Sequence, residues 1–228
     1  IALAIFVLRQ FRLDQPLLEL RVLKTFNYDL AVLLTAISYI ALIVVTIIFP
    51  LYYQNVLGVT PFISGMALVP GAVVLSILNP LTGKLADHFG FRKVMLSGML
   101  LICLGWLLLV LFTAQMNLWT LMVLAALIEG GNAFVMMPAV TLGANSLPDD
   151  LIAHGTAVIT TVRQILGSTG VALATLILAN ATANALHRGA AAATADLHGY
   201  RVVFITFLVV ELVGLALAFM LKGKPKKA

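Results

Sequence analysis

The chain contains 228 residues, of which 62% are hydrophobic and 10% are charged, and its mean hydropathy is +1.09. This composition excludes an ordinary soluble domain and indicates an integral membrane protein. The formal net charge of +5 does not indicate nucleic-acid binding, because almost all basic residues lie in short loops or in the C-terminal tail. A single cysteine, Cys103, excludes a framework of intrachain disulfides.

Hydropathy divides the chain into one unit and its flanks. Residues 1–8 are apolar but too short to span a bilayer, and we interpret them as the cytoplasmic end of a span that begins upstream. Residues 9–28 form a polar linker. Six apolar segments then follow, each near the length of about 20 residues that crosses the hydrocarbon as a helix; they are residues 29–51, 63–82, 93–114, 118–142, 154–181 and 200–221. We therefore predict an all-α membrane protein with a six-helix transmembrane bundle at 29–222 and a basic tail at 223–228.

Basic residues are concentrated on one side of the predicted membrane. Of the 14 Lys and Arg residues, only Arg188 and Arg201 lie in junctions on the opposite side, and Arg163 lies within a span. The positive-inside rule therefore predicts a multi-pass protein of the cell membrane with its C-terminus in the cytoplasm. The Ala-rich segment 181–199 is then the longest outer loop, which can be a helical extension or a mobile cap.

A charged loop joins the second and third predicted spans. It reads GKLADHFGFRK over residues 83–93. Gly83 allows close packing and Gly90 allows a tight turn, while Asp87 can cap a helix or pair with a basic residue. These properties are equally compatible with a charged turn that only anchors topology.

The spacing in this loop resembles the G-x-L-A-D-x-x-G-x-R-K loop of the major facilitator superfamily, whose Asp and basic residues act as a latch for one transport conformation. The resemblance assigns this latch to Gly83, Asp87, Gly90, Arg92 and Lys93. His88 and Phe91 stand where the family usually has Arg, so a complete charge relay is not implied.

Other segments resemble the fourteen-span EmrB/QacA-type drug:proton antiporters of that superfamily. RQFR at 9–12 and PLLEL at 16–20 are similar to the linker before span nine, and LPDDLIAHGTA at 147–157 with RQILGSTG at 163–170 is similar to the penultimate span. The resemblance covers essentially the whole chain. It implies the C-terminal half of a major facilitator fold, with an N-terminal half missing from this sequence, and proton-coupled export of small amphipathic molecules by alternating access.

Three ionisable residues lie near the middle of predicted spans, namely Glu129, Arg163 and Glu211. A charge at the helix centre costs about 2.5–3.5 kcal/mol on insertion scales, so each is a functional candidate. We assign coupling or substrate binding to Glu129 with Asn132 and to Arg163 with Gln164. Because Glu129 and Arg163 lie at similar depth on consecutive spans, they can instead form a structural ion pair, which protonation of Glu129 could open. The role of Glu211 stays open.

Small and aromatic residues within the spans complete the candidates. Gly167 and Gly170 are predicted to pack against a neighbouring helix. Pro70 is predicted to bend the second span. Tyr39 and Phe49 of the first span are candidates for lining a substrate cavity.

The sequence predicts neither an enzyme nor a cofactor or metal site. Its four histidines are scattered over loops and span ends without metal-ligand spacing. The expected partners are a small amphipathic substrate, protons, the lipid bilayer and the N-terminal half, but no nucleic acid. A non-transporting receptor or assembly subunit and, less favoured, an intramembrane enzyme are the alternative functions.

Overall fold

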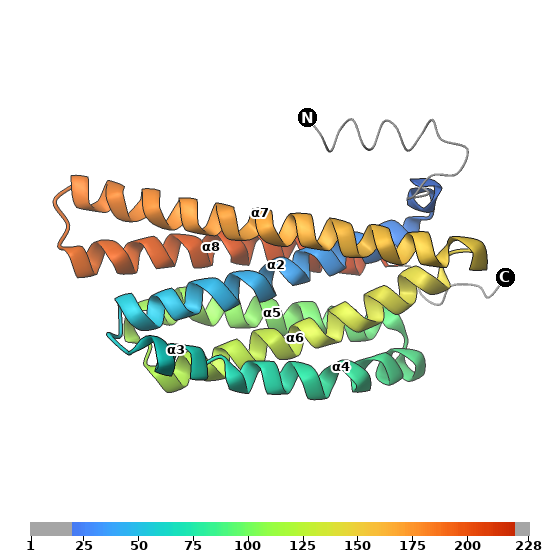
Figure 1. Cartoon of the computed structure of the whole chain (residues 1–228), viewed down its shortest axis with the longest axis horizontal. Coiled ribbons are helices and arrows are strands. Elements are labelled where there is room, and N and C mark those ends of the chain that lie inside the picture. The colour runs from blue at the N-terminus through green and yellow to red at the C-terminus, as the bar shows by residue number, and fades with distance from the viewer. Residues whose placement is uncertain (1–19, 222–228) are drawn as a thin grey trace.

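The computed structural model describes residues 20–221. The predicted span end at 1–8, most of the linker at 9–28 and the basic tail at 223–228 lie outside these residues. Within the described range all regular structure is helical, which confirms the predicted all-α fold (Figure 1). The elements are the 3₁₀ helix η1 (Leu20–Lys24), α2 (Phe26–Asn55), α3 (Pro61–Met66), α4 (Val69–Phe89), α5 (Phe91–Phe112), η2 (Thr113–Gln115), α6 (Leu118–Asn145), η3 (Asp149–Leu151), α7 (Ile152–His187) and α8 (Ala192–Phe219).

Six units are long and apolar enough to cross a membrane: α2, α3 with α4, α5 with η2, α6, η3 with α7, and α8. They correspond one to one with the predicted spans. The second unit is broken at residues 67–68, just before Pro70. Proline lacks the N–H that would continue a helix and clashes with the preceding turn, so the predicted bend is observed as a break between α3 and α4.

The charged segment 83–93 is almost entirely helical rather than an extended loop. Gly83 and Asp87 belong to the end of α4, whereas Arg92 and Lys93 belong to the first turn of α5. Gly90 alone separates the two helices, and its φ of +92° is in the range that glycine adopts without strain. This one-residue turn fixes the direction in which α5 leaves α4.

The predicted outer loop at 181–199 is also mostly helical. Helix α7 runs to His187 and α8 begins at Ala192, so residues 188–191 alone connect them. At about 1.5 Å per residue, the 36 residues of α7 are about 54 Å long, well beyond the roughly 30 Å of a hydrocarbon core. The tip of the α7–α8 hairpin accordingly projects past the other helices (Figure 1).

Helix α6 lies at the centre of the bundle, where it packs against α5, α4 and α2. Its closest approach is to α5, where Gly131 faces Gly98. A Cβ atom on Gly98 would lie 2.7 Å from the Gly131 carbonyl oxygen, and one on Gly131 would lie 2.8 Å from the Gly98 oxygen. The two backbones therefore touch, as small residues allow in membrane helices.

Helix α2 is held to α7 in a similar way. A Cβ atom on Gly167 would lie 2.7 Å from the ring of Tyr39, and one on Gly170 would lie 2.6 Å from Ile40 Cγ2. Gly167 and Gly170 thus lie where α7 approaches α2 closely.

An aromatic cluster closes the bundle at the end away from the 83–93 segment. Tyr52 of α2 and Tyr200 of α8 lie 5.0 Å apart between ring centroids, and Trp106 packs on Phe204. Phe49 belongs to this cluster and is fully buried against Phe204. The prediction that Phe49 lines a cavity is therefore wrong, because its ring is enclosed by the helices of this bundle.

Replacing Gly131 with alanine should destabilise the bundle, because the added methyl group meets the backbone of α5 rather than a movable side chain. We expect a loss of about 1–3 kcal/mol, measured as thermal unfolding of the purified protein in detergent. Gly65→Ala is the matched control, since Gly65 of α3 has no atom within 4 Å of an added Cβ. Equal unfolding midpoints for the two variants would contradict the contact.

Candidate functional site

Glu129 lies in the middle of α6 and is buried, with 4% of its surface exposed. Its carboxyl group is directed at α4, where Gly71 leaves room for it. A Cβ atom on residue 71 would lie 2.8 Å from Glu129 Cδ and 2.9 and 3.0 Å from its two oxygens. Gly130 faces the same helix, near Val74. The carboxyl group thus occupies a contact between α4 and α6 that only glycine at residue 71 permits.

Asn132 lies one turn further along α6 and is fully buried. Its Nδ2 donates a hydrogen bond of 2.6 Å to the carbonyl oxygen of Ser38 in α2. In the described residues its Oδ1 has no partner, and neither has the hydroxyl of Ser38. Asn132 therefore joins α6 to α2 at mid-depth.

Arg163 and Gln164 of α7 both contact Tyr39 of α2. The Tyr39 hydroxyl donates a hydrogen bond of 2.9 Å to Gln164 Oε1, and the Arg163 guanidinium carbon lies 5.0 Å from the centroid of the Tyr39 ring. The second distance is within the range of a cation–π interaction. Arg163 Nε is buried and makes no hydrogen bond to the described residues. An aromatic ring, a guanidinium group and an amide thus converge where α2 meets α7.

The ion pair predicted between Glu129 and Arg163 is not formed by the described residues. Glu129 points at α4, and Arg163 lies over Tyr39 of α2. Depth in the membrane was the basis of the prediction, and α6 and α7 do follow one another in the chain. They contact each other far less than α6 contacts α4 and α2, so similar depth does not bring the two side chains together.

Polar side chains form a line along the outward face of α7. Thr156, Thr160, Gln164 and Ser168 recur every four residues, and all four are exposed. The hydroxyl groups of Thr156 and Thr160 each donate to a carbonyl one turn earlier at 2.9 Å, and that of Ser168 does so at 2.5 Å. The three hydroxyl protons are thus hydrogen-bonded within the helix, while the residues that carry them are exposed. We call these four residues the α7 polar face.

The residues of the predicted latch are separated in this conformation. Asp87 is exposed and forms no ion pair with the described residues. Arg92 Nη2 instead donates a hydrogen bond of 3.0 Å to the carbonyl oxygen of Phe219, the last residue of α8. A guanidinium group at this position satisfies a free carbonyl and complements the negative end of the helix dipole. Arg92 therefore anchors α5 to α8, and it is not paired with Asp87.

Glu211 of α8 is fully buried, and neither of its carboxyl oxygens has a hydrogen-bond partner in the described residues. Cys103 of α5 lies close enough to interact electrostatically with it. One turn away, Gly214 packs on Met99 and Ile37. Glu211 thus faces the interior between α8 and α5, rather than lipid or another part of the protein.

Sequence reasoning missed Gly71, Ser38 and most of the α7 polar face. The four-residue recurrence of hydroxyl and amide side chains was a readable signal for that face. Gly71 offered a weaker signal, as a glycine directly after the helix-breaking Pro70. Ser38 was not detectable, because it is the backbone carbonyl of this residue that accepts from Asn132.

In the described part of the chain, no group of three or more His, Cys, Asp and Glu side chains is placed to hold a metal ion. Fold and site together define a six-helix membrane bundle that keeps one polar face uncovered, which is the architecture of a transporter half. The sequence model of the Major Facilitator Superfamily matches residues 31–228. The chain belongs to this superfamily, which comprises membrane transporters rather than enzymes.

Individual relatives support the same assignment. The chain is 40% identical to the uncharacterized MFS-type transporter YcnB of Bacillus subtilis, over 100% of its own length and 48% of that protein. It is 35% identical to the lincomycin resistance protein LmrB of Listeria innocua over 78% of the chain and 38% of the relative. With the multidrug resistance protein Stp of Mycobacterium tuberculosis it shares 26% identity over 77% of the chain and 33% of the relative. The chain spans about half or less of the length of these curated relatives.

Replacing Glu211 with methionine should stabilise the protein, because a buried carboxyl group without partners costs about 1–3 kcal/mol that an apolar side chain of similar size avoids. The expected result is a higher midpoint of thermal unfolding in detergent. Glu211→Gln is the matched control, since it keeps the shape and retains an unpartnered polar group. A methionine variant no more stable than the wild type would contradict the absence of partners for the carboxyl group.

Proposed function

We propose that this chain is the C-terminal six-helix half of a fourteen-span drug exporter of the EmrB/QacA type. The observation that carries the proposal is the α7 polar face beside the Tyr39, Arg163 and Gln164 cluster. Exposed polar side chains at membrane depth are costly against lipid, so such a face lines an aqueous path or meets another protein part. Relatives about twice as long as this chain, two of them named for drug resistance, support one part of a longer transporter and the substrate class.

Two of the six spans are much less buried than α2 and α6, which supports a further part of the protein packing against them. In α2 and in α6, 56% of the most apolar stretch is buried. In the α3–α4 span and in the η3–α7 span, only 17% of the corresponding stretch is buried. We infer that α4 and α7 face the N-terminal half of the same protein. Transport then proceeds by rocking of the two halves about a central cavity, with both ends of this chain in the cytoplasm.

The cluster of Tyr39, Arg163 and Gln164 is suited to a small amphipathic molecule. The ring offers a flat apolar surface, Gln164 offers an amide, and the guanidinium group offers hydrogen-bond donors. Because the contacts of Arg163 and Gln164 with Tyr39 cross from α7 to α2, a substrate that engages this cluster acts on the packing of two helices at once.

Proton coupling is assigned to Glu129. A neutral carboxyl group fits against the backbone of α4 at Gly71, but a carboxylate in this buried contact carries a large desolvation cost. Loss of the proton therefore favours separation of α4 from α6, and gain of a proton favours their contact. Since α4 is one of the two least buried spans, this change is transmitted to the surface that meets the other half. Exchange of a proton for the substrate follows from this linkage.

Neutralising Glu129 should uncouple export from the proton gradient. In vesicles containing the intact protein, we expect Glu129→Gln to reduce gradient-driven efflux of a fluorescent amphipathic dye by about tenfold or more, equivalent to about 1.4 kcal/mol of coupling. Gly71→Ala should alter the pH dependence of efflux without loss of fold, because the added methyl group displaces only the end of the Glu129 side chain. Gly65→Ala is the control. Efflux by Glu129→Gln with an unchanged pH dependence would exclude Glu129 as the coupling group.

The exposed Asp87 retains the latch role in this proposal, with its partner in the other half. Asp87→Asn should impair efflux while protein abundance and unfolding temperature stay normal, because Asp87 forms no ion pair with the residues that the structure describes. Arg92→Gln should instead lower stability by about 0.3–1 kcal/mol, since it removes the contact with the end of α8. Normal efflux by Asp87→Asn would reduce the 83–93 segment to a topology anchor.

A further inference from the structure

A cavity with both polar and apolar lining residues lies at the tip of the α7–α8 hairpin, outside every residue assigned above. It has a volume of about 400 Å³. Asn184 and Arg188 line it from the end of α7 and Thr194 and His198 line it from the start of α8, and the remaining wall consists of three alanines. Small alanine side chains leave the space between the two helices open. The cavity is therefore built by the sequence 181–198, which the function proposed above does not use.

The cavity lies beyond the end of α2, at one end of the bundle. Tyr200 of α8 accepts a hydrogen bond from Asn55, the last residue of α2, so residues of α8 before Tyr200 extend past the end of α2. Trp119, which is 72% exposed in the first turn of α6, marks the membrane interface at the same end, as tryptophan commonly does. Figure 1 shows the hairpin extending beyond this level.

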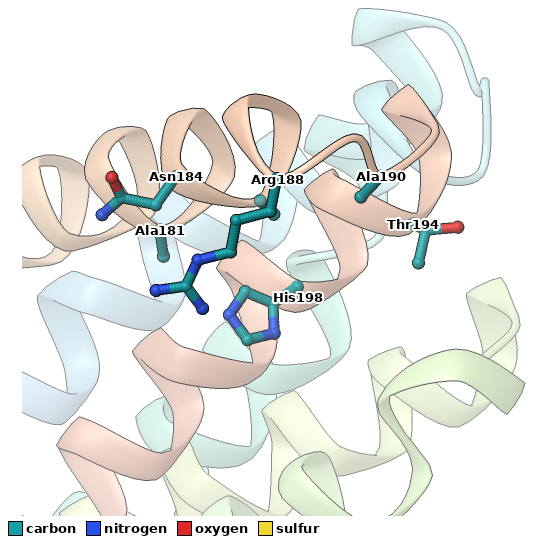
Figure 2. A pocket seen from close by; sticks show the side chains of 7 residues that line it. Ala181, Asn184, Arg188, Ala190, Thr194 and His198 are labelled. Carbon is teal, nitrogen blue, oxygen red and sulfur yellow. The ribbon is translucent and has the colours of Figure 1, made fainter.

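The polar side chains that line the cavity either carry a positive charge or can donate hydrogen bonds. Figure 2 shows the Arg188 side chain reaching back from the turn between the helices, so that its guanidinium group lies beside the His198 ring. The Asn184 amide lies on the same side (Figure 2). No carboxylate lines the cavity within the described residues. Asp196, the nearest in sequence, lies two residues from His198 and thus on the opposite side of α8, where it interacts with Tyr200.

The backbone brings two helix ends of opposite dipole together beside the cavity. Gly189 has a φ of +85°, which lets the chain reverse within four residues and brings the end of α7 beside the beginning of α8. The N-cap of α8 is Ala191, whose side chain cannot accept a hydrogen bond from the first turn. Thr194 lies in that turn, at the positive end of the helix dipole.

We propose that this cavity binds a phosphate group, carried either by an anionic lipid headgroup or by a soluble phosphate. A planar guanidinium group binds two phosphate oxygens at once, and the His198 imidazole beside it and the Asn184 amide supply further donors. Binding joins the ends of α7 and α8, two helices whose remaining contacts run along their apolar lengths. The site is independent of the proton and substrate sites proposed above.

The test compares the intact purified protein with the Arg188→Gln/His198→Gln double variant. Both residues are exposed, so the double variant is expected to unfold at the wild-type temperature without ligand. Thermal unfolding is followed in detergent during titration with dioleoyl phosphatidylglycerol, with sodium phosphate, and with phosphate-free dioleoylglycerol. We expect at least one of the two phosphate-bearing probes to raise the unfolding temperature of the wild type. The apparent dissociation constant of that probe should be about tenfold or more higher for the double variant than for the wild type.

Arg201→Gln and His187→Gln are the matched controls, since both residues lie near the same end of the bundle but outside the cavity lining. They should respond as the wild type does. A selective loss of the phosphatidylglycerol response in the double variant identifies a lipid site, and a selective loss of the sodium phosphate response identifies a soluble ligand. The proposal is overturned if the double variant responds like the wild type, if dioleoylglycerol is as effective as phosphatidylglycerol, or if neither phosphate probe stabilises the wild type.

Discussion

The backbone contact between α5 and α6 at Gly98 and Gly131 is the constraint on which the bundle depends. In lipid there is no hydrophobic gain from bringing two apolar helices together, so their association relies on close packing and internal hydrogen bonds. The glycine pair allows that packing at the centre of the bundle, and Gly130 continues it toward α4. Glu129 and Asn132 flank these glycines, so the contact that holds α6 in place also positions its two polar side chains.

Polar residues inside the bundle fall into two groups with different consequences. Asn132 and Thr82 bond to backbone carbonyls of neighbouring helices, Ser38 in α2 and Ala133 in α6. Such bonds satisfy polar groups in a medium that offers no water, and they fix the relative positions of α2, α4 and α6. The α7 polar face has no helix of this bundle covering it. Asn132 and Thr82 are therefore bonded within the bundle, whereas the α7 polar face stays exposed in the described residues.

Hydropathy was sufficient to predict the six spans, because the length of an apolar segment is set by bilayer thickness. At 181–199 it left a helical extension and a mobile cap open, and the helical extension is observed, because alanine favours helix even where Asn, Thr and His lower the hydropathy. The candidates Glu129 and Arg163 were detectable because charges within spans are rare. Their partners were not, since a sequence gives the depth of a residue but not the direction in which its helix face points.

Glu129 and Glu211 show why direction matters more than charge. Both are glutamates near the middle of a span and both are buried, yet they face different parts of the bundle. Glu211 lies between α8 and α5, next to Met99 and Ile37 through its neighbour Gly214, in packing that the closed interior holds fixed. Glu129 lies against α4, which has few contacts on its other side. A change of charge at Glu129 can move a helix that is free to respond, whereas the same change at Glu211 meets a packed core. We therefore propose that the position of an acidic group relative to the least buried spans, more than its presence in a span, separates a coupling group from a structural one in this fold.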